Sequence, residues 1–160
     1  MLFRSEEQTT QVKEGEPIEL GELRINVQLT RFLNPNDQED GEYLQGQPIP
    51  PPGKSYLGVF LEATNEGDDD VTLPGITDMQ VVDTTDAHYD PIETDNIFGF
   101  PFGTTLGPDE RVPALESAAG QGPINGSIVI FLVDQGVSEN RPLELELLAD
   151  GEKGTIELDL

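Results

Sequence analysis

Apolar residues recur at every second position in several segments of this chain, a period typical of β-strands and unlike that of an amphipathic helix. The segment from Glu22 to Leu33 has such a face, formed by Leu23, Ile25, Val27 and Leu29. The segment from Tyr56 to Asn65 has another, formed by Leu57, Val59, Leu61 and Ala63. Because successive strand residues point to opposite sides, each segment can cover one side of a buried core.

Further segments extend this strand pattern. Short strands are predicted over residues 77–85 and around His88 and Tyr89. The segment Gly126–Val133 is apolar at nearly every position, which predicts a central strand buried on both faces. The chain closes with a predicted hairpin across an Asp-Gly loop, in which Leu143, Leu145 and Leu147 face Ile156, Leu158 and Leu160.

The 17 glycines and 13 prolines lie mostly between these segments, as expected for short strands joined by turns. We therefore predict an all-β fold, an immunoglobulin-like antiparallel β-sandwich of seven or eight strands, over residues 16–160. The stretch Asn34–Lys54 has no periodicity and is predicted to be a long loop.

Residues 1–15 are predicted to be a flexible N-terminal lead or the remnant of a tether. They have no apolar run of the kind that a secretory signal needs, and no segment of the chain is long and apolar enough for a membrane span. The strand pattern, by contrast, continues to Leu160. We therefore expect no direct membrane insertion of this chain and an anchor through an N-terminal segment that the sequence lacks.

The chain carries 32 acidic and 8 basic side chains, for a net charge of −24. A surface of this charge repels phosphate backbones and anionic lipid headgroups, so we expect no nucleic-acid partner. Two interpretations of the acidity stay open. One is solubility, including adaptation to a salty medium, which we favour, and the other is a dedicated cation-binding role. Weak association of cations is kept as a possible interaction.

The order of strands and turns resembles a family of bacterial immunoglobulin-like extracellular domains of unknown function, common in lipoproteins and similar to secreted immunoprotective antigens. The residues that match its turn and core positions are Asn65, Asp83, Tyr89, Pro108, Glu110, Gly126 and Phe131. The chain departs from the family at Ala87 and Asp109, where turn glycines are usual, and at Val112–Pro123, which resembles an insertion. The resemblance implies a sandwich outside the cell and no particular activity.

Three consecutive aspartates, Asp68, Asp69 and Asp70, follow the strand that ends at Asn65. Calcium needs six or more oxygen ligands from several segments, and the spacing of an EF-hand loop is absent. We interpret the triplet as a solvated turn, where short polar side chains support tight backbone geometry. The three residues are kept as weak calcium candidates, and no cofactor is expected.

No catalytic residues are predicted, and we expect the protein not to be an enzyme. His88 is the only histidine and the chain has no cysteine, which excludes a cysteine nucleophile and the usual zinc clusters. A serine nucleophile elbow is also missing. A carboxylate pair of the kind that cleaves glycosides stays open among so many acids, so a small carboxylate-dependent hydrolase is one alternative.

Three of the seven phenylalanines, Phe98, Phe100 and Phe102, lie close together in a glycine-containing segment without strand periodicity. Aromatic residues on such a loop either plug the open end of a sandwich or anchor a partner. We favour the plug, and name the three residues as binding candidates if any surface recognises a ligand. The predicted function is a non-enzymatic extracellular or cell-surface module that binds a protein or surface ligand. The other alternative is a structural subunit of a surface or virion assembly.

Overall fold

The computed structural model describes residues 10–94, 96–121, 124 and 126–160. Its strands are β1 (Thr10–Lys13), β2 (Ile18–Leu20), β3 (Leu23–Leu33), β4 (Lys54–Asn65), β5 (Val71–Thr72), β6 (Met79–Val82), β7 (His88–Tyr89), β8 (Pro91–Ile92), β9 (Thr105–Leu106), β10 (Arg111–Val112), β11 (Ser127–Asp134), β12 (Glu144–Ala149) and β13 (Glu152–Glu157). The helical segments are α2 (Gln38–Tyr43), η1 (Ile76–Asp78), α3 (Ala118–Gln121) and η2 (Gln135–Asn140).

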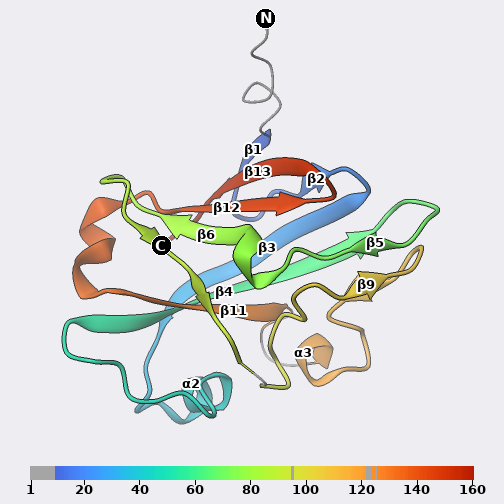
Figure 1. Cartoon of the computed structure of the whole chain (residues 1–160). Coiled ribbons are helices and arrows are strands. Elements are labelled where there is room, and N and C mark those ends of the chain that lie inside the picture. The colour runs from blue at the N-terminus through green and yellow to red at the C-terminus, as the bar shows by residue number, and fades with distance from the viewer. Residues whose placement is uncertain (1–9, 95, 122–123, 125) are drawn as a thin grey trace, which may run out of the picture.

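Two sheets pack face to face, and Figure 1 shows them as an upper and a lower layer. The five-stranded sheet has the order β1-β13-β12-β6-β7, and the six-stranded sheet has the order β2-β3-β4-β11-β8 with β10 beside β4. Strands β5 and β9 form a small third ladder at one end. This arrangement confirms the predicted all-β sandwich. Five of the thirteen strands that the structure describes are only two residues long, which leaves eight longer ones.

The apolar faces predicted from alternation form the main core between the sheets. Leu57, Val59, Leu61 and Ala63 of β4 are all buried there. Strand β11 is buried on both faces, as its sequence predicts: Val129 and Phe131 lie in the main core, whereas Ile128 and Ile130 lie on the opposite face of the sheet. The six-stranded sheet therefore has a second apolar cluster on its outer side, formed by Leu33, Tyr43, Leu44, Tyr56, Phe60, Ile128 and Ile130.

Leu29 is not on the predicted inner face of β3. Val27 pairs with Leu61 and Leu29 pairs with the next residue back, Phe60. Gln28 therefore has no partner on β4 and forms a β-bulge. Such a bulge reverses the alternation of the residues that follow it. Leu29 consequently packs against the second cluster on the outer side of the sheet.

The stretch Asn34–Lys54 is not a loop throughout, because it contains the helix α2. Asp37 caps this helix by accepting hydrogen bonds from the backbone N–H groups of Glu39 and Asp40. The helix buries Tyr43 over the second cluster and lies beneath β4 and β11 in Figure 1. A six-residue helix is too short to show a helical period in the sequence.

The N-terminal stretch enters the fold before the predicted boundary at residue 16. Thr10–Lys13 forms β1, which pairs in parallel with β13. Glu14 extends this connection, since its carboxylate accepts hydrogen bonds from the Thr30 hydroxyl and from the backbone N–H of Asp159. Residues 1–9, the rest of the predicted lead, lie outside the described residues.

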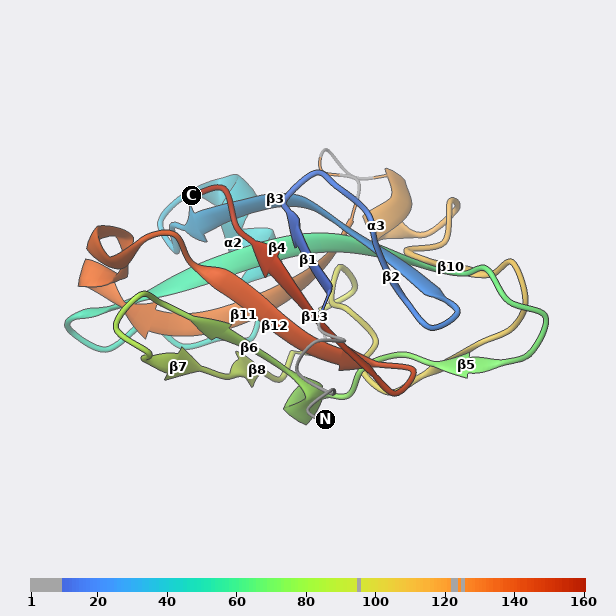
Figure 2. The same ribbon diagram turned by 90° about the horizontal axis from the view of Figure 1, so that it is seen from above.

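The C-terminal hairpin forms across the predicted Asp-Gly loop. Asp150 and Gly151 both have positive φ, 49° and 79°, as the two-residue type I′ turn requires. Leu145 faces Ile156, while Leu147 faces Gly154 and Leu160 follows the end of β13. In Figure 2 the hairpin, drawn in red, crosses over the strands of the other sheet.

The turn at Gly107–Glu110 explains one departure from the family that the sequence resembles. Asp109 has a φ of 66°. With Pro108 before it, this is the third position of a type II turn, which favours glycine because L side chains are strained at positive φ. Ala87, the other departure, has no positive φ, since Asp86 takes it instead with a φ of 68°.

We expect Asp109→Gly to leave the free energy of unfolding nearly unchanged and Asp109→Ala to lower it by about 1 kcal/mol. Both variants remove the same charge and keep the backbone hydrogen bond from residue 109 to the carbonyl of Asn65. The difference between them therefore isolates the backbone strain. Urea unfolding of the two variants measures it, and equal stabilities would contradict the strained-turn interpretation.

Candidate binding surfaces

The segment Phe98–Phe102, called the phenylalanine loop below, is hydrogen-bonded to β11. It uses the same edge of β11 as β8 does, at the neighbouring position. Ile128 donates its N–H to the carbonyl of Phe98 at 2.8 Å, and Phe100 donates to the carbonyl of Ile128 at 2.9 Å. The two hydrogen bonds form one isolated parallel β-bridge between Gly99 and Ile128, at the edge of the six-stranded sheet. The sequence shows no strand period here because only one residue takes part.

The three rings lie in different surroundings. Phe100 is 4% exposed and belongs to the main core. Phe102 is half-buried beside it, with ring centroids 5.4 Å apart. Phe98 is half-buried in the second cluster, where its ring meets Tyr43 edge-on at 5.0 Å. The loop thus contributes rings to both cores.

A pocket of about 710 Å³ opens between the phenylalanine loop and the turn that follows α2. Its residues combine apolar rings with a carboxylate: Gly46, Gln47, Ile76, Glu93, Thr94, Phe100, Pro101 and Phe102. Gln47 donates a hydrogen bond to the Glu93 carbonyl at 3.1 Å, which joins the two walls. The partly exposed ring of Phe102 is the aromatic group that a partner could contact here.

The three aspartates lie in the turn between β4 and β5, which projects from one end of the sandwich (Figure 1). They line a hollow of about 380 Å³ together with Glu22, Glu66, Gly67, Val71 and Asp150. The Asp150 carboxylate accepts a hydrogen bond from the N–H of Glu22 at 2.8 Å. Within the part of the chain that the structure describes, no three carboxylate or histidine side chains are arranged to hold a metal ion.

Asn65 organises the backbone beneath these aspartates. Its buried side chain donates to the carbonyls of Asp69 at 2.8 Å and Leu106 at 3.0 Å, and accepts from the N–H of Gly67 at 2.9 Å. One amide therefore joins the end of β4 to the acidic turn and to β9. This gives the turn a structural support that depends on no ion.

Sodium chloride is expected to stabilise the protein smoothly as its concentration rises. Glu144 stands directly opposite Glu157, and the net charge is −24, so repulsion weakens the folded state until salt screens it. Calcium at equal ionic strength is expected to add only a modest increment that magnesium reproduces. Thermal melts in the three salts measure this. A saturating rise with micromolar calcium, lost in Asp69→Asn/Asp70→Asn, would instead establish a chelating site.

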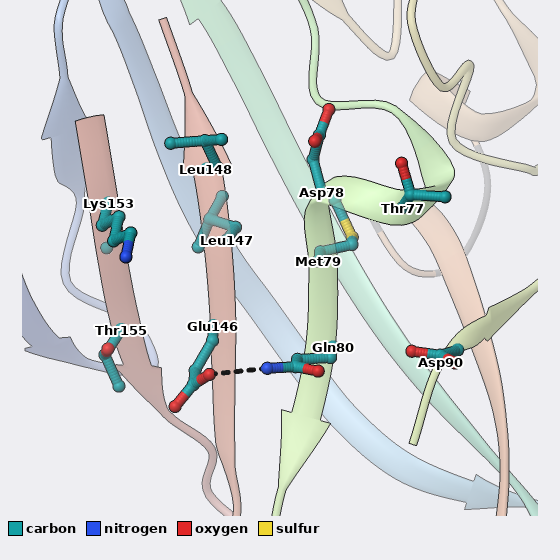
Figure 3. Close-up of a pocket in the computed structure, with 11 residues that line it drawn as sticks. Thr77, Asp78, Met79, Gln80, Asp90, Glu146, Leu147, Leu148, Lys153 and Thr155 are labelled. Atoms are coloured by element: carbon teal, nitrogen blue, oxygen red, sulfur yellow. Dashed lines mark hydrogen bonds between the residues drawn. The ribbon is translucent and has the colours of Figure 1, made fainter. Parts of the chain in front are cut away.

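A groove of about 410 Å³ lies on the outer face of the five-stranded sheet, across β13, β12 and β6 (Figure 3). Sequence reasoning did not find it, because its lining comes from several strands and most of the side chains are polar residues of the kind that ordinarily face solvent. The lining residues are Thr77, Asp78, Met79, Gln80, Asp90, Glu146, Leu147, Leu148, Lys153, Gly154 and Thr155. Leu148 is 41% exposed there, an unusual place for a leucine on a sheet surface.

Hydrogen bonds connect three polar side chains on this face of the sheet, those of Glu146, Gln80 and His88. Gln80 donates to the Glu146 carboxylate at 2.8 Å, and its carbonyl oxygen lies 3.0 Å from Nδ1 of His88. The single histidine thus extends a polar chain at the edge of the sheet. It is exposed and sits on β7 beside Tyr89.

Asp134 connects the two sheets at the far end of β11. It forms an ion pair with Lys54 and accepts a hydrogen bond from the Tyr89 hydroxyl at 3.1 Å. The bond from Lys54 and then that from Tyr89 lower the pKa of Asp134 below its ordinary value. Burial and the same bond to Asp134 raise the pKa of Tyr89. We interpret this cluster as a structural brace between β4, β7 and β11.

Asp83, another residue that carries the family resemblance, closes the turn before β7. Burial opposes its ionisation, but hydrogen bonds from Thr85 and Ala87 outweigh burial and lower the pKa of Asp83. The bonds to Oδ1 from the N–H and hydroxyl of Thr85 are 2.8 and 2.7 Å long. Asn65, Asp83 and Tyr89 all form hydrogen bonds that hold turns or strands in place. The residues that carry the family resemblance therefore support the fold.

Comparison with known proteins supports the same fold. No protein-family model matches the chain, and no curated protein is similar to it in sequence. Among solved structures, an uncharacterised β-sandwich protein from Clostridium difficile is similar with a TM-score of 0.53 and 17% identity, over 94% of this chain and 95% of that one. A predicted lipoprotein of Bacillus subtilis reaches 0.59 at 14% identity, over 92% of this chain and 39% of that one.

The secreted protein MPT63 from Mycobacterium tuberculosis is also similar, with a TM-score of 0.52 and 12% identity, over 93% of this chain and 97% of that one. At these identities the likeness establishes the fold alone. The chain is a β-sandwich of the architecture found in these bacterial proteins.

Proposed function

We propose that the chain is a non-enzymatic interaction module that acts outside the cell, in secreted or surface-anchored form. Its binding site for a protein or surface ligand is the pocket beside the phenylalanine loop. The observation that carries this proposal is the half-exposed ring of Phe102, held over a 710 Å³ pocket by the buried Phe100. A rigidly positioned aromatic ring next to a carboxylate is a favourable anchor for a partner.

The location is supported by the proteins that share the fold, since they include a secreted protein and a predicted lipoprotein. The strongly negative surface is compatible with a solvent-exposed module and repels anionic lipid headgroups. In the described residues, no helix has the length and apolar character that a membrane span needs. The likeness to a predicted lipoprotein also supports the proposal that an N-terminal tether presents the module at a surface.

Site-specific photo-crosslinking tests this function. A photoreactive phenylalanine analogue at position 102, in protein made by cells of the source organism, is expected to capture one partner exposed outside the cell. Excess unlabelled wild-type protein should compete, whereas protein with Glu93→Gln and Phe102→Ala should compete at least ten times less well.

The same analogue at Glu139, an exposed residue of η2, is the control and should capture nothing specific. Identical products from both positions would contradict the pocket as the binding site. Products that contain only copies of this chain would favour a structural subunit of an assembly. Fractionation of the same cells tests the location, and a purely cytosolic protein would overturn the extracellular role.

A further inference from the structure

The groove in Figure 3 is lined by one cationic side chain, Lys153, and by three carboxylates, those of Asp78, Glu146 and Asp90. Lys153 of β13 faces Leu148 of β12 directly. Leu147 faces Met79, the first residue of β6, and Asp78 precedes it as the last residue of η1, so Asp78 lies beyond Leu148 on its other side without pairing with it. Since neighbouring strands are about 4.8 Å apart, Lys153 and Asp78 are separated by roughly 10 Å with an exposed leucine between them.

The neighbouring row of outward-facing side chains, two residues along the strands from Leu148, contributes further polar groups. It contains Thr155, Glu146 and Gln80, and Figure 3 places Asp90 beyond Gln80 at the far side of the groove. Asp78 and Asp90 therefore lie on one side of the groove and Lys153 and Thr155 on the other, with Leu148 and Glu146 of β12 between them. The carboxylates of Asp78, Glu146 and Asp90 are called the acidic side below. Among the described residues, neither Lys153 nor any of the three carboxylates has an ion-pair partner.

The carboxylates of the acidic side still have room for a cation. Asp78 accepts one hydrogen bond, from the N–H of Gly75 at 2.8 Å, and Glu146 accepts one from Gln80. A carboxylate has about four acceptor positions, so most of them face the groove or solvent. Lys153 likewise keeps donors for an anionic group.

We propose that this groove binds the C-terminal end of a short basic peptide. The terminal carboxylate lies at Lys153, in the row of Leu148 and not in that of Glu146, a lysine or arginine side chain lies at the acidic side, and the alkyl part of the peptide covers Leu148. Three extended residues span about 10 Å, which matches the distance from Lys153 to Asp78. This second site is separate from the pocket at the phenylalanine loop.

Charge favours this ligand over simpler ones. The net charge of −24 attracts basic peptides and repels acidic ones before contact. The ammonium group of Lys153 then distinguishes a peptide with a free carboxylate from a plain polycation, because it repels the polycation. An exposed charge pair contributes roughly 0.2–1 kcal/mol, and the upper part of this range, about 0.4–1 kcal/mol, corresponds to a preference of about two- to fivefold in affinity.

Calorimetric titration with trilysine and with its C-terminal amide tests the proposal. Wild-type protein is expected to bind the free acid about two to five times more tightly, although the amide carries one more unit of net positive charge. Lys153→Met should reverse this preference. Lys54→Met, which removes the same charge from the other sheet, should leave the preference unchanged.

The acidic side is tested with Asp90→Asn/Glu146→Gln, which should weaken binding of both peptides several-fold. The charge-matched control, Asp69→Asn/Asp70→Asn in the β4–β5 turn, should weaken binding far less. Amide resonances of Leu148, Lys153 and Thr155 should shift on titration, and Phe102→Ala should change none of these results.

Tighter binding of the amide by wild-type protein would overturn the proposal, as would a Lys153→Met variant that keeps the wild-type preference. Equal binding of spermidine and trilysine would show general attraction of cations and would also overturn it. Because Phe102 takes no part, these outcomes leave the function proposed for the phenylalanine loop unaffected.

Discussion

Replacing Phe100 with alanine is expected to lower the free energy of unfolding by roughly 3–5 kcal/mol, the range of buried aromatic truncations. The side chain is 4% exposed in the main core, so its removal leaves a cavity that the attached loop cannot easily fill. For a domain of this size the loss corresponds to a fall in melting temperature of roughly 6–20 °C. Thermal and urea unfolding measure it.

Phe102→Ala is the matched control, since it removes the same ring from a half-buried position on the same loop. It should cost clearly less stability than Phe100→Ala and, by the proposed function, should remove most partner binding. An unchanged melting temperature in Phe100→Ala would show that the loop does not close the sandwich. Equal losses in both variants would contradict the division between a supporting and a binding ring.

Asn65→Ala is expected to cost at least about 3 kcal/mol. The substitution leaves the carbonyls of Asp69 and Leu106 and the N–H of Gly67 without their side-chain partner. Each buried polar group that loses its hydrogen bond costs about 1–3 kcal/mol. Hydrogen exchange should rise first at the β4–β5 turn and at β9, because the amide joins these segments.

Asn65→Asp keeps the shape and the acceptor for Gly67 but directs a carboxylate at two carbonyl oxygens. Folding should therefore raise the pKa of the new aspartate above its unfolded value. The destabilisation is then full above the folded pKa and decreases as pH falls through it, because the protonated acid can donate one hydrogen bond. Stability relative to wild type, measured from pH 8 to 4, should rise on acidification. A constant difference would contradict the assigned donors.

Alternation predicted the parts of the fold in which one strand face is buried. The inner residues of β4, the doubly buried β11 and the hairpin across Asp150 and Gly151 are all found as expected. These features depend on the period of two and on local turn geometry, which are properties of short segments. The weak calcium candidates and the phenylalanine loop were also chosen by local composition, and their roles stay predictions.

The sequence by itself therefore determined the strand class, the inner face of most strands and the acidity of the surface. Only the tertiary structure decided where the alternation breaks, because the bulge at Gln28 depends on how β3 pairs with β4. It also decided that α2 and Phe98 cover a second cluster, since that cluster forms between residues far apart in the chain. The groove arises in the same way: strand register sets Lys153 beside Leu148, and the pairing of Leu147 with Met79 brings Asp78 of η1 to the other side of Leu148, so no segment alone contains that order.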